Sequence, residues 1–189
     1  MIGLSASDTA LIVVDLQNAV MAQPVGPRSS AAVLGNCRLL AERFRAAGAP
    51  VILLNVAFAP DFADALQTPT DRPSPAAKGH LIENWSLLAE GLADPSDIRI
   101  TKRQWGGFYG TDLDLQLRRR NVRSVVIGGI ATNFGVESTA RSAHEHGYAP
   151  IVVEDACASL TTDMHDFAFT RIFPFLGRVA RTNDISVTG

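Results

Sequence analysis

Short apolar runs rich in β-branched residues alternate along the chain with longer segments in which apolar residues recur at helical spacing. The first apolar run covers residues 9–14 (TALIVV), and the first helical pattern covers residues 30–47. A run that is apolar at successive positions is typical of a strand buried on both faces, whereas helical spacing indicates a helix with one buried face. The chain is therefore expected to open with a buried strand followed by a covering helix.

The same alternation continues toward the end of the chain. Further strands are predicted at 50–56, 98–101, 122–127 and 150–153, with an edge strand at 177–180, and further helices at 111–120, 133–146 and 163–173. Gly48 and Gly147 follow two of the helical patterns, where glycine favours helix termination. Strands that alternate with helices imply right-handed crossovers, and hence an α/β fold of three layers (α/β/α, Rossmann-like) around a parallel sheet.

One region, residues 57–97, interrupts this alternation. It contains prolines 60, 69, 73, 75 and 95 and shows little periodicity before Leu81. So long an irregular stretch in a compact domain is often functional, as a lid or an interface, although an ordered surface excursion has the same pattern. Both interpretations stay open at this stage.

Composition narrows the class of protein. The chain has 189 residues, of which 47% are hydrophobic and 19% charged, and its formal net charge is -2. These values suit a single domain spanning residues 1–189, and they do not favour a nucleic-acid partner, which would select a basic stripe. No apolar run reaches membrane-spanning length, the N-terminus lacks the pattern of a secretory leader, and the two cysteines form no disulfide framework. We therefore expect a cytoplasmic protein with no membrane partner.

Polar residues follow several of the predicted strands. Asp15 follows the first strand, Lys102 the third, and the turn that contains Gly135 the fourth. In an open parallel sheet the ligand crevice lies at the carboxyl ends of the strands, so these residues are candidates for a site. Burial raises the pKa of a carboxyl and a neighbouring ammonium lowers it, so Asp15 beside Lys102 could be tuned for proton transfer. A structural ion pair, or an Asp that caps a turn, is the alternative.

Three motifs resemble a known family. They are VVDLQN at 13–18, TKRQWGGFYGTDLDLQLRRRNV at 101–122, and VVIGGIATNFGVESTARSAHEHGY at 125–148. Together they look like the isochorismatase-like hydrolase family, the cysteine-hydrolase group that includes nicotinamidases and N-carbamoylsarcosine amidase, and they resemble an uncharacterised bacterial subgroup of it. The resemblance covers nearly the whole chain. It implies a hydrolase built on a six-stranded parallel sheet, with the predicted strands in the order 3-2-1-4-5-6.

The resemblance also implies a site and a departure from it. The family has an Asp-Lys-Cys triad, to which Asp15 and Lys102 match, and a cis peptide that would join Ile130 to Ala131 here. The backbone amides of Ala131 and Gly135 would then donate to an oxyanion. The nucleophilic Cys of the family aligns with Gly135, which cannot form an acyl-enzyme intermediate.

Other residues are poorer nucleophiles by position. Cys157 follows the fifth strand, but its EDACAS context resembles a family stretch of small residues packed beside the sheet, and Cys37 lies within a helix. Ser138 and Thr139 lie one helical turn beyond the candidate site and would need a base. The histidines, at positions 80, 144, 146 and 165, do not follow strands, and most are expected on solvated surfaces.

Loss of the thiol leaves one hydrolytic reaction open. Isochorismatases of this family also carry glycine at the nucleophile position and cleave a vinyl ether, a reaction that needs an acid and water. On this interpretation Asp15 is the general acid and Lys102 orients it and sets its pKa. The candidate substrate-binding residues are Gln17, Phe58, Gln104, Trp105 and Phe108, for each of which plain packing is the alternative.

The expected partners follow from the same resemblance. We expect a small-molecule substrate that is anionic in the manner of isochorismate, for which Arg72 and Arg103 are available cations. The stretch NVAFAPDFADAL after the second strand has no histidine, so neither a catalytic metal nor a cofactor is expected. Members of the family commonly form homodimers or homotetramers, with Trp105 to Tyr109 and the 57–97 region as contact surfaces. A family member that only binds a small molecule, and a structural oligomer without a ligand, remain alternatives.

Overall fold

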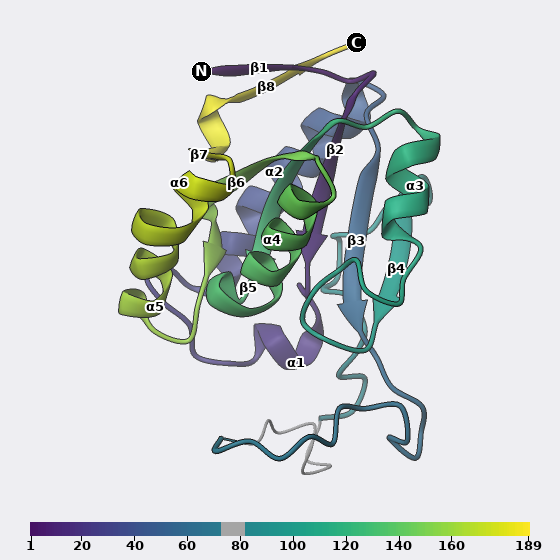
Figure 1. Ribbon diagram of the computed structural model, residues 1–189, viewed down its shortest axis with the longest axis vertical. Coiled ribbons are helices and arrows are strands. Elements are labelled where there is room, and N and C mark those ends of the chain that lie inside the picture. The colour runs from purple at the N-terminus through teal and green to yellow at the C-terminus, as the bar shows by residue number, and fades with distance from the viewer. Residues whose placement is uncertain (73–81) are drawn as a thin grey trace.

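A six-stranded parallel sheet forms the centre of the computed structural model, which describes residues 1–72 and 82–189. The strand order is β4-β3-β2-β5-β6-β7, and every neighbouring pair is parallel (Figure 1). The strands are β2 (Thr9–Val14), β3 (Val51–Val56), β4 (Ile98–Lys102), β5 (Ser124–Ile130), β6 (Ala149–Ala158) and β7 (Arg178–Ala180). Counted along the chain, this order is the 3-2-1-4-5-6 expected from the sequence, so the predicted fold is confirmed.

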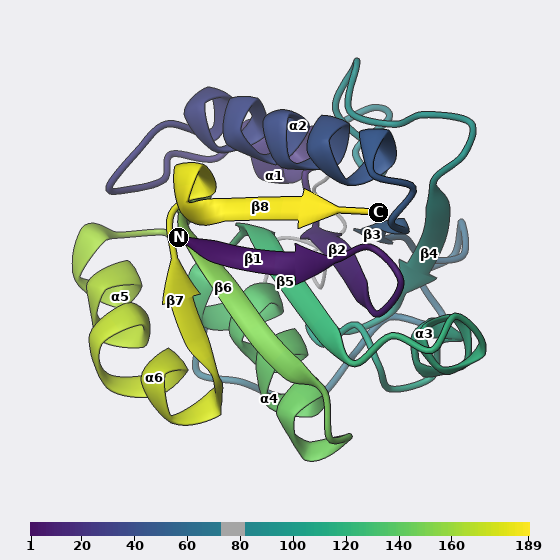
Figure 2. The same ribbon diagram turned by 90° about the horizontal axis from the view of Figure 1, so that it is seen from above.

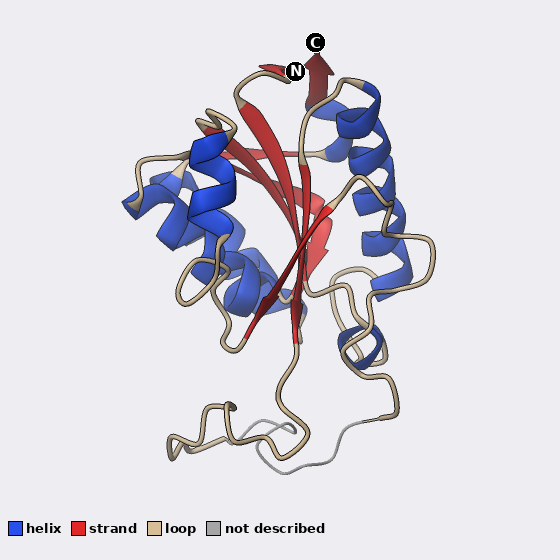
Figure 3. Cartoon of the chain, turned by 90° about the vertical axis from the view of Figure 1, so that its right-hand side faces the viewer, coloured by secondary structure: helices blue, strands red, loops and turns tan. Residues whose placement is uncertain are grey.

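Helices cover both faces of the sheet (Figure 3). One face carries α2 (Ser30–Ala46), with the short α1 (Asn18–Met21) beside it. The other face carries α3 (Leu113–Arg119), α4 (Glu137–Glu145), α5 (Thr162–Phe167) and α6 (Phe173–Leu176). Each helix contributes a narrow apolar face, and the sheet must therefore be apolar on both of its own faces.

Strand β2 shows how the sequence meets this requirement. All six of its residues are buried. Leu11 and Val13 pack into the cluster under α2, whereas Ile12 and Val14 pack into the cluster on the opposite face. Successive side chains of a strand point to opposite faces, so an uninterrupted apolar run fills both cores. Each fully buried aliphatic side chain stabilises the fold by about 1.5–3 kcal/mol relative to an exposed one.

A second, two-stranded parallel sheet joins the two ends of the chain. It pairs β1 (Ile2–Ser5) with β8 (Ile185–Thr188), and Figure 2 shows both termini there. Ile2 and Ile185 are buried in the same cluster as α2. This sheet was not predicted, because each of its strands is only four residues long and has one buried residue.

Several predicted boundaries move in the structure. The strand expected at 122–127 runs from Ser124 to Ile130. The strand expected at 150–153 continues to Ala158. The pairing register between these two strands shifts between Ile127 and Gly129. Gly129 allows the close approach of β5 and β2, since a Cβ there would lie 2.1 Å from the Val14 carbonyl oxygen. The apolar pattern indicated the strands correctly, but it did not reveal that these two extend into the site.

Two predicted helices contain π-helical turns. The helix expected at 133–146 begins as a π-helical turn, Thr132–Val136, and continues as α4. The helix expected at 163–173 is divided into α5, a π-helical turn at Ala168–Ile172, and α6. Single π-helical turns are frequent at functional sites, and the first of these lies directly after β5.

Residues 57–72 extend beyond the carboxyl ends of the strands, and the described parts of the 57–97 region contain no helix or strand (Figure 1). The rings of Phe58, Phe62 and Trp85 stack against one another with centroids 5.6–6.4 Å apart. The returning part is tied to the segment after β2, since the Ala89 amide donates to the Leu16 carbonyl at 2.8 Å. Residues 73–81, which include two of the five prolines, lie outside the described residues. No helix in the described chain is long and apolar enough to cross a membrane.

Candidate functional site

Asp15 lies directly after β2, where the backbone leaves the sheet. Its φ of 54° is in the left-handed region, which is uncommon for a residue with a side chain and recurs at active sites. The conformation is held on both sides, because its amide donates to the Leu54 carbonyl at 3.0 Å and its carbonyl accepts from the Gln17 amide at 2.8 Å. The carboxyl group is thereby fixed at the carboxyl edge of the sheet and is largely buried.

Lys102 ends β4 and lies two strands away from β2. Its side chain is fully buried, and its Nζ donates to Asp15 Oδ2 at 2.7 Å and to the Gln104 carbonyl at 3.0 Å. Among the described residues, the other carboxyl oxygen, Asp15 Oδ1, is buried without a hydrogen-bond partner. The pair is therefore fixed on one side and has an unused polar atom on the other.

The electrostatics of Asp15 combine two opposing effects. Burial raises the pKa of the Asp15 carboxyl, and the charge and hydrogen bond of Lys102 lower it, with the net pKa above the ordinary value. A buried carboxyl with a raised pKa holds a proton at a higher pH than an exposed one. Asp15 can therefore serve as a general acid. Lys102 limits how far the pKa of Asp15 rises.

Gly135 faces this pair from the π-helical turn after β5. A Cβ built on it would lie 3.0 Å from Asp15 Oδ2, 3.0 Å from a methyl carbon of Val14 and 3.4 Å from the Trp105 carbonyl oxygen. The peptide bond between Ile130 and Ala131 is cis, as the family resemblance implied. The structure thus brings Asp15, Lys102 and Gly135 together, and no side chain occupies position 135.

The two candidate glutamines use their amides to hold backbone. Gln17 is buried, with Oε1 accepting from the Val56 amide at 2.7 Å and Nε2 donating to the Val56 carbonyl at 3.0 Å and the Trp85 carbonyl at 3.3 Å. Gln104 donates from Nε2 to the carbonyls of Gly106 (2.9 Å) and Tyr109 (2.6 Å). Gln17 bridges two segments, Gln104 holds the loop that follows it, and the contact of either residue with a substrate stays a prediction.

The three candidate aromatic residues separate in space. The Trp105 ring is 60% exposed and meets the Phe134 ring edge-on at 5.0 Å, beside the turn that carries Gly135. Phe58 stacks on the aromatic group of the 57–97 region. Phe108 is instead buried in the core, with its ring 4.8 Å from that of His146 and 5.9 Å from that of Tyr148, near the amino end of β6. The structure does not bring Phe108 to the site, so packing is the correct interpretation for it.

Neither cysteine is in a position or a protonation state suited to nucleophilic catalysis. Both are fully buried. Burial raises the pKa of the Cys157 thiol to about 12, and that of Cys37 well above its usual range. Since the thiolate is the nucleophile, these environments describe inert thiols. The Thr139 hydroxyl donates to the Gly135 carbonyl at 2.6 Å and accepts from the Gly107 amide at 3.1 Å, which is a structural role.

One histidine departs from the surface location expected for most of them. His165 on α5 is buried, and its Nδ1 lies 2.8 Å from the Thr132 hydroxyl. His144 and His146 are exposed, and His80 lies outside the described residues. The sequence offered a signal, because His165 shares a helical face with Ala168 and Phe169, both buried. A histidine on an apolar helix face is expected to be internal and hydrogen-bonded.

Arg103, a candidate for binding a substrate carboxylate, forms an exposed ion pair. Its Nε lies 2.5 Å from Asp64 Oδ2, and the pair joins the loop after β4 to the 57–97 region. A substrate anion would have to compete with Asp64 for this guanidinium, so a binding role for Arg103 stays a prediction. Within residues 1–72 and 82–189, no cluster of three or more His, Cys, Asp or Glu side chains is arranged to hold a metal ion.

A surface hollow lies beside the edge strand β4. It is lined by Asn55, Arg99, Thr101 and residues between 86 and 93. Neither Asp15 nor Lys102 lines it. The hollow is therefore a surface feature separate from the Asp15–Lys102 ion pair, which lies at the carboxyl ends of the strands.

Comparison with known proteins agrees with the fold. The sequence-family model of the Isochorismatase domain matches residues 9–184 of this chain. The uncharacterized isochorismatase family protein YecD of Escherichia coli O157:H7 is 46% identical over 186 residues, which cover 98% of each chain. The solved structure of an isochorismatase family protein from Burkholderia thailandensis superposes with a TM-score of 0.90 at 46% identity, covering 95% of this chain and 94% of that one. The ureidoacrylate amidohydrolase RutB of Rhizobium rhizogenes is 30% identical over 212 residues, covering 99% of this chain and 85% of RutB.

The protein is a three-layer α/β protein with a parallel sheet, and a buried carboxylate–ammonium pair lies at the carboxyl ends of its strands. With the domain match and these relatives beside it, the chain belongs to the isochorismatase family, a family of hydrolases.

Proposed function

We propose that this protein is a hydrolase that works without a thiol nucleophile, with Asp15 as the general acid acting on a small metabolite that contains a vinyl ether or a related group. The observation that carries the proposal is the position of Gly135. Its missing side chain would begin 3.0 Å from Asp15 Oδ2, which is where a nucleophile of the triad would stand. The acid and its ammonium partner are retained around the gap.

Hydrolysis of a vinyl ether needs only an acid and a water molecule. Protonated Asp15 gives its proton to the terminal carbon of the enol double bond, and the electron pair of that bond forms the new C–H bond. The resulting oxocarbenium ion is attacked by water, which forms a C–O bond. The adduct then expels an alcohol, leaves a carbonyl compound, and returns one proton to Asp15. No covalent bond to the enzyme forms, so a glycine at position 135 is compatible with every step.

Other residues receive supporting roles in this proposal. Lys102 positions the Asp15 carboxyl and limits its pKa. The backbone amides of Ala131 and Gly135 donate to the oxygen of the departing alcohol, on which negative charge develops as the adduct breaks down. Trp105 and Phe58 provide apolar walls. Gln17 joins the end of β3 to the segment of Trp85, and Gln104 holds the loop that carries Trp105. We also propose a homodimer or homotetramer, in which a neighbouring chain closes the exposed side of the site.

Two other functions stay in view. A family member without turnover could bind a small molecule at the same site, and the retained Asp15–Lys102 pair supports either interpretation. Amide hydrolysis, the reaction in the name of the relative RutB, would need another nucleophile. Cys157 is the residue available for it, and its full burial and raised pKa argue against that role.

The test is a turnover assay on the full chain with isochorismate and a panel of enolpyruvyl ethers, in which pyruvate release is measured. Asp15→Asn is expected to abolish release while calorimetric binding of the same compound persists. Binding without release in the native protein would favour the non-catalytic function. Hydrolysis of ureidoacrylate or another amide that is lost in Cys157→Ala would overturn the proposal.

A further inference from the structure

The turn that carries Gly135 is held from behind by residues far along the chain. Thr132 and Asn133 follow the cis peptide directly. The Thr132 hydroxyl lies 2.8 Å from His165 Nδ1, and Asn133 Oδ1 accepts a hydrogen bond from the Ser159 hydroxyl. Thr132 and Ser159 are fully buried and His165 is nearly so. Two successive residues of the turn are thus bound to α5 and to the segment that links β6 to α5.

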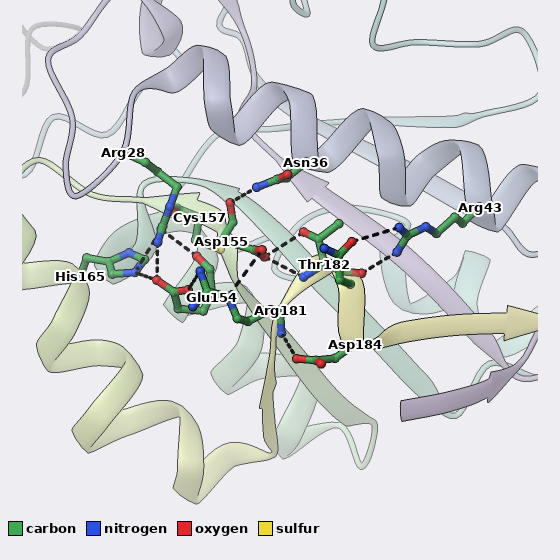
Figure 4. Close-up of polar contacts among 11 residues, drawn as sticks. Arg28, Asn36, Arg43, Glu154, Asp155, Cys157, His165, Arg181, Thr182 and Asp184 are labelled. Carbon is green, nitrogen blue, oxygen red and sulfur yellow. Dashed lines mark hydrogen bonds and ion pairs between the residues drawn. The ribbon is translucent and has the colours of Figure 1, made fainter. Parts of the chain in front are cut away.

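That segment is itself anchored. Gly26 and Ser159 exchange both backbone hydrogen bonds at 2.8 Å, in an isolated antiparallel bridge. Arg28, two residues later, donates to the carbonyls of Glu154 (2.9 Å) and Cys157 (2.6 Å) and to the Glu154 carboxylate. Figure 4 shows Arg28, Glu154 and His165 converging from three different segments. The partners of the turn therefore have little freedom to move.

Neutral histidine fits this arrangement. Burial lowers the pKa of His165, an effect that the nearby Arg28 charge reinforces and that Glu154 and Asp166 oppose. The Glu154 carboxylate, whose pKa is lowered by the Arg28 hydrogen bond against the effect of burial, lies 3.3 Å from Nε2. Nε2 then carries the proton and donates to Glu154, which leaves Nδ1 to accept the hydroxyl proton of Thr132. This tautomer gives both ring nitrogens a hydrogen-bond partner, while Arg28 Nη1, which lies 3.4 Å from Nε2, donates to the carbonyls of Glu154 and Cys157.

We propose that His165 is a positioning residue, which through the Thr132 hydroxyl fixes the 131–135 turn that carries the two amides of the proposed oxyanion site. This role rests on the proposed function, because the turn affects turnover only if its amides meet a developing charge. Among the described residues, His165 makes no hydrogen bond to Asp15 or Gly135, and its hydrogen bond to the turn is the one with Thr132. A buried hydrogen bond to a turn residue is also more useful for orientation than for stability, since the net gain from one such bond is small.

The experiment compares Thr132→Val, which keeps the shape and removes the hydroxyl, with Thr132→Ser, which keeps the hydroxyl. Nuclear magnetic resonance of the full chain measures amide hydrogen exchange in 131–135 and the ring nitrogens of His165. In Thr132→Val the exchange is expected to become about fivefold faster or more in 131–135 with β2 unchanged, and the Nδ1 resonance of His165 to shift. Thr132→Ser should restore both. In His165→Phe, amide exchange in 131–135 should be as fast as in Thr132→Val. In His144→Gln, which changes an exposed histidine, this exchange should be the same as in the native protein.

Turnover separates this inference from the proposed function. If the native chain hydrolyses an enol ether, Thr132→Val is expected to lower kcat about tenfold with KM within about twofold, and Thr132→Ser to recover it. Equal exchange in the Val and Ser variants, or faster exchange spread evenly over β2 and β5, would overturn the positioning role. So would an unchanged kcat in an active Thr132→Val enzyme. If no compound is turned over while the exchange responds as expected, the proposed function fails and the coupling of His165 to the turn stands.

Discussion

A side chain at position 135 would begin 3.0 Å from Asp15 Oδ2, the same oxygen that Lys102 binds at 2.7 Å. Gly135 therefore marks the place of a third catalytic side chain without supplying one. A carboxyl so close to that place could activate a thiol if one were present, and could protonate a substrate that occupies the space instead. The geometry links the missing residue to the reaction proposed here.

Filling the gap should have a measurable cost and a chemical effect. Gly135→Ala is expected to lower the free energy of unfolding by about 1–3 kcal/mol, because its Cβ is crowded by Asp15 and Val14 and the neighbours must shift by a few tenths of an ångström. Urea denaturation measures this change. Gly35→Ala is the control, since a Cβ at that helical position meets nothing within 4 Å.

Gly135→Cys should in addition create a reactive thiol. The native cysteines are buried, so iodoacetamide should label the folded variant at position 135 and leave the folded native chain unlabelled. Mass spectrometry of the digested protein locates the label. An absence of labelling at 135 in a folded variant would show that this position is closed to small molecules, which would contradict its place in the site.

The Asp15–Lys102 pair predicts a pH dependence. Because Lys102 lowers the pKa of Asp15, Lys102→Met should raise that pKa further above the value in the unfolded chain. A carboxyl with a raised folded-state pKa is protonated more readily in the folded than in the unfolded state. The folded state then gains stability as the pH falls through that raised pKa and loses it as the pH rises toward neutrality. The variant should therefore lose about 3–5 kcal/mol of unfolding free energy at pH 8 and clearly less at pH 5.

Denaturation of Lys102→Met at these two pH values provides the measurement. The double variant Asp15→Asn/Lys102→Met is the control, because without the carboxyl the difference between pH 5 and pH 8 should largely disappear. If Asp15 is the general acid, kcat/KM of the native enzyme should also fall as the pH rises through the Asp15 pKa. A rate that increases over that range would assign Asp15 the role of a base.

The two cysteine thiols should be unreactive in the folded protein. Cys157 has a pKa raised to about 12 and no exposed surface, so it is expected to react with a disulfide reagent only when the chain unfolds. Cys157→Ala should retain any hydrolytic activity and lower the unfolding free energy by about 1 kcal/mol. The labelling rate, measured against urea concentration, should follow the unfolding transition. Rapid labelling of the native chain would reopen Cys157 as a nucleophile.

Much of this architecture was accessible from the sequence, for a physical reason. Buried parallel strands must be apolar on both faces, so runs such as TALIVV indicate strands directly, and their carboxyl ends indicate where polar residues meet. Asp15 and Lys102 were predicted in this way, although a whole strand, β3, lies between their strands. The terminal sheet was not predicted, because two four-residue strands carry too short a pattern.

The roles of individual side chains were harder to predict. Phe108 follows Lys102 closely in sequence, yet the chain turns back and buries its ring beside Tyr148 at the other end of the sheet. The surface location expected for most of the histidines does not hold for His165, whose partners, Thr132 and Glu154, come from other elements. Periodicity describes which face of an element is buried, and it does not identify the polar partner that a buried side chain meets across the core.

Gln17 offers a final prediction that concerns the frame of the site. Its amide makes three hydrogen bonds, two with Val56 at the end of β3 and one with the Trp85 carbonyl in the returning part of the 57–97 region. Gln17→Leu keeps a similar volume but leaves these backbone groups unpaired, so it should cost about 2–4 kcal/mol of unfolding free energy. Gln23→Leu, at an exposed glutamine, is the control and should change it by less than about 0.5 kcal/mol. Hydrogen exchange should show the loss first at the amides of Val56 and of residues 85–89, because Gln17 joins them. A uniform change over the whole sheet would mean that Gln17 is an ordinary core residue and does not bridge the two segments.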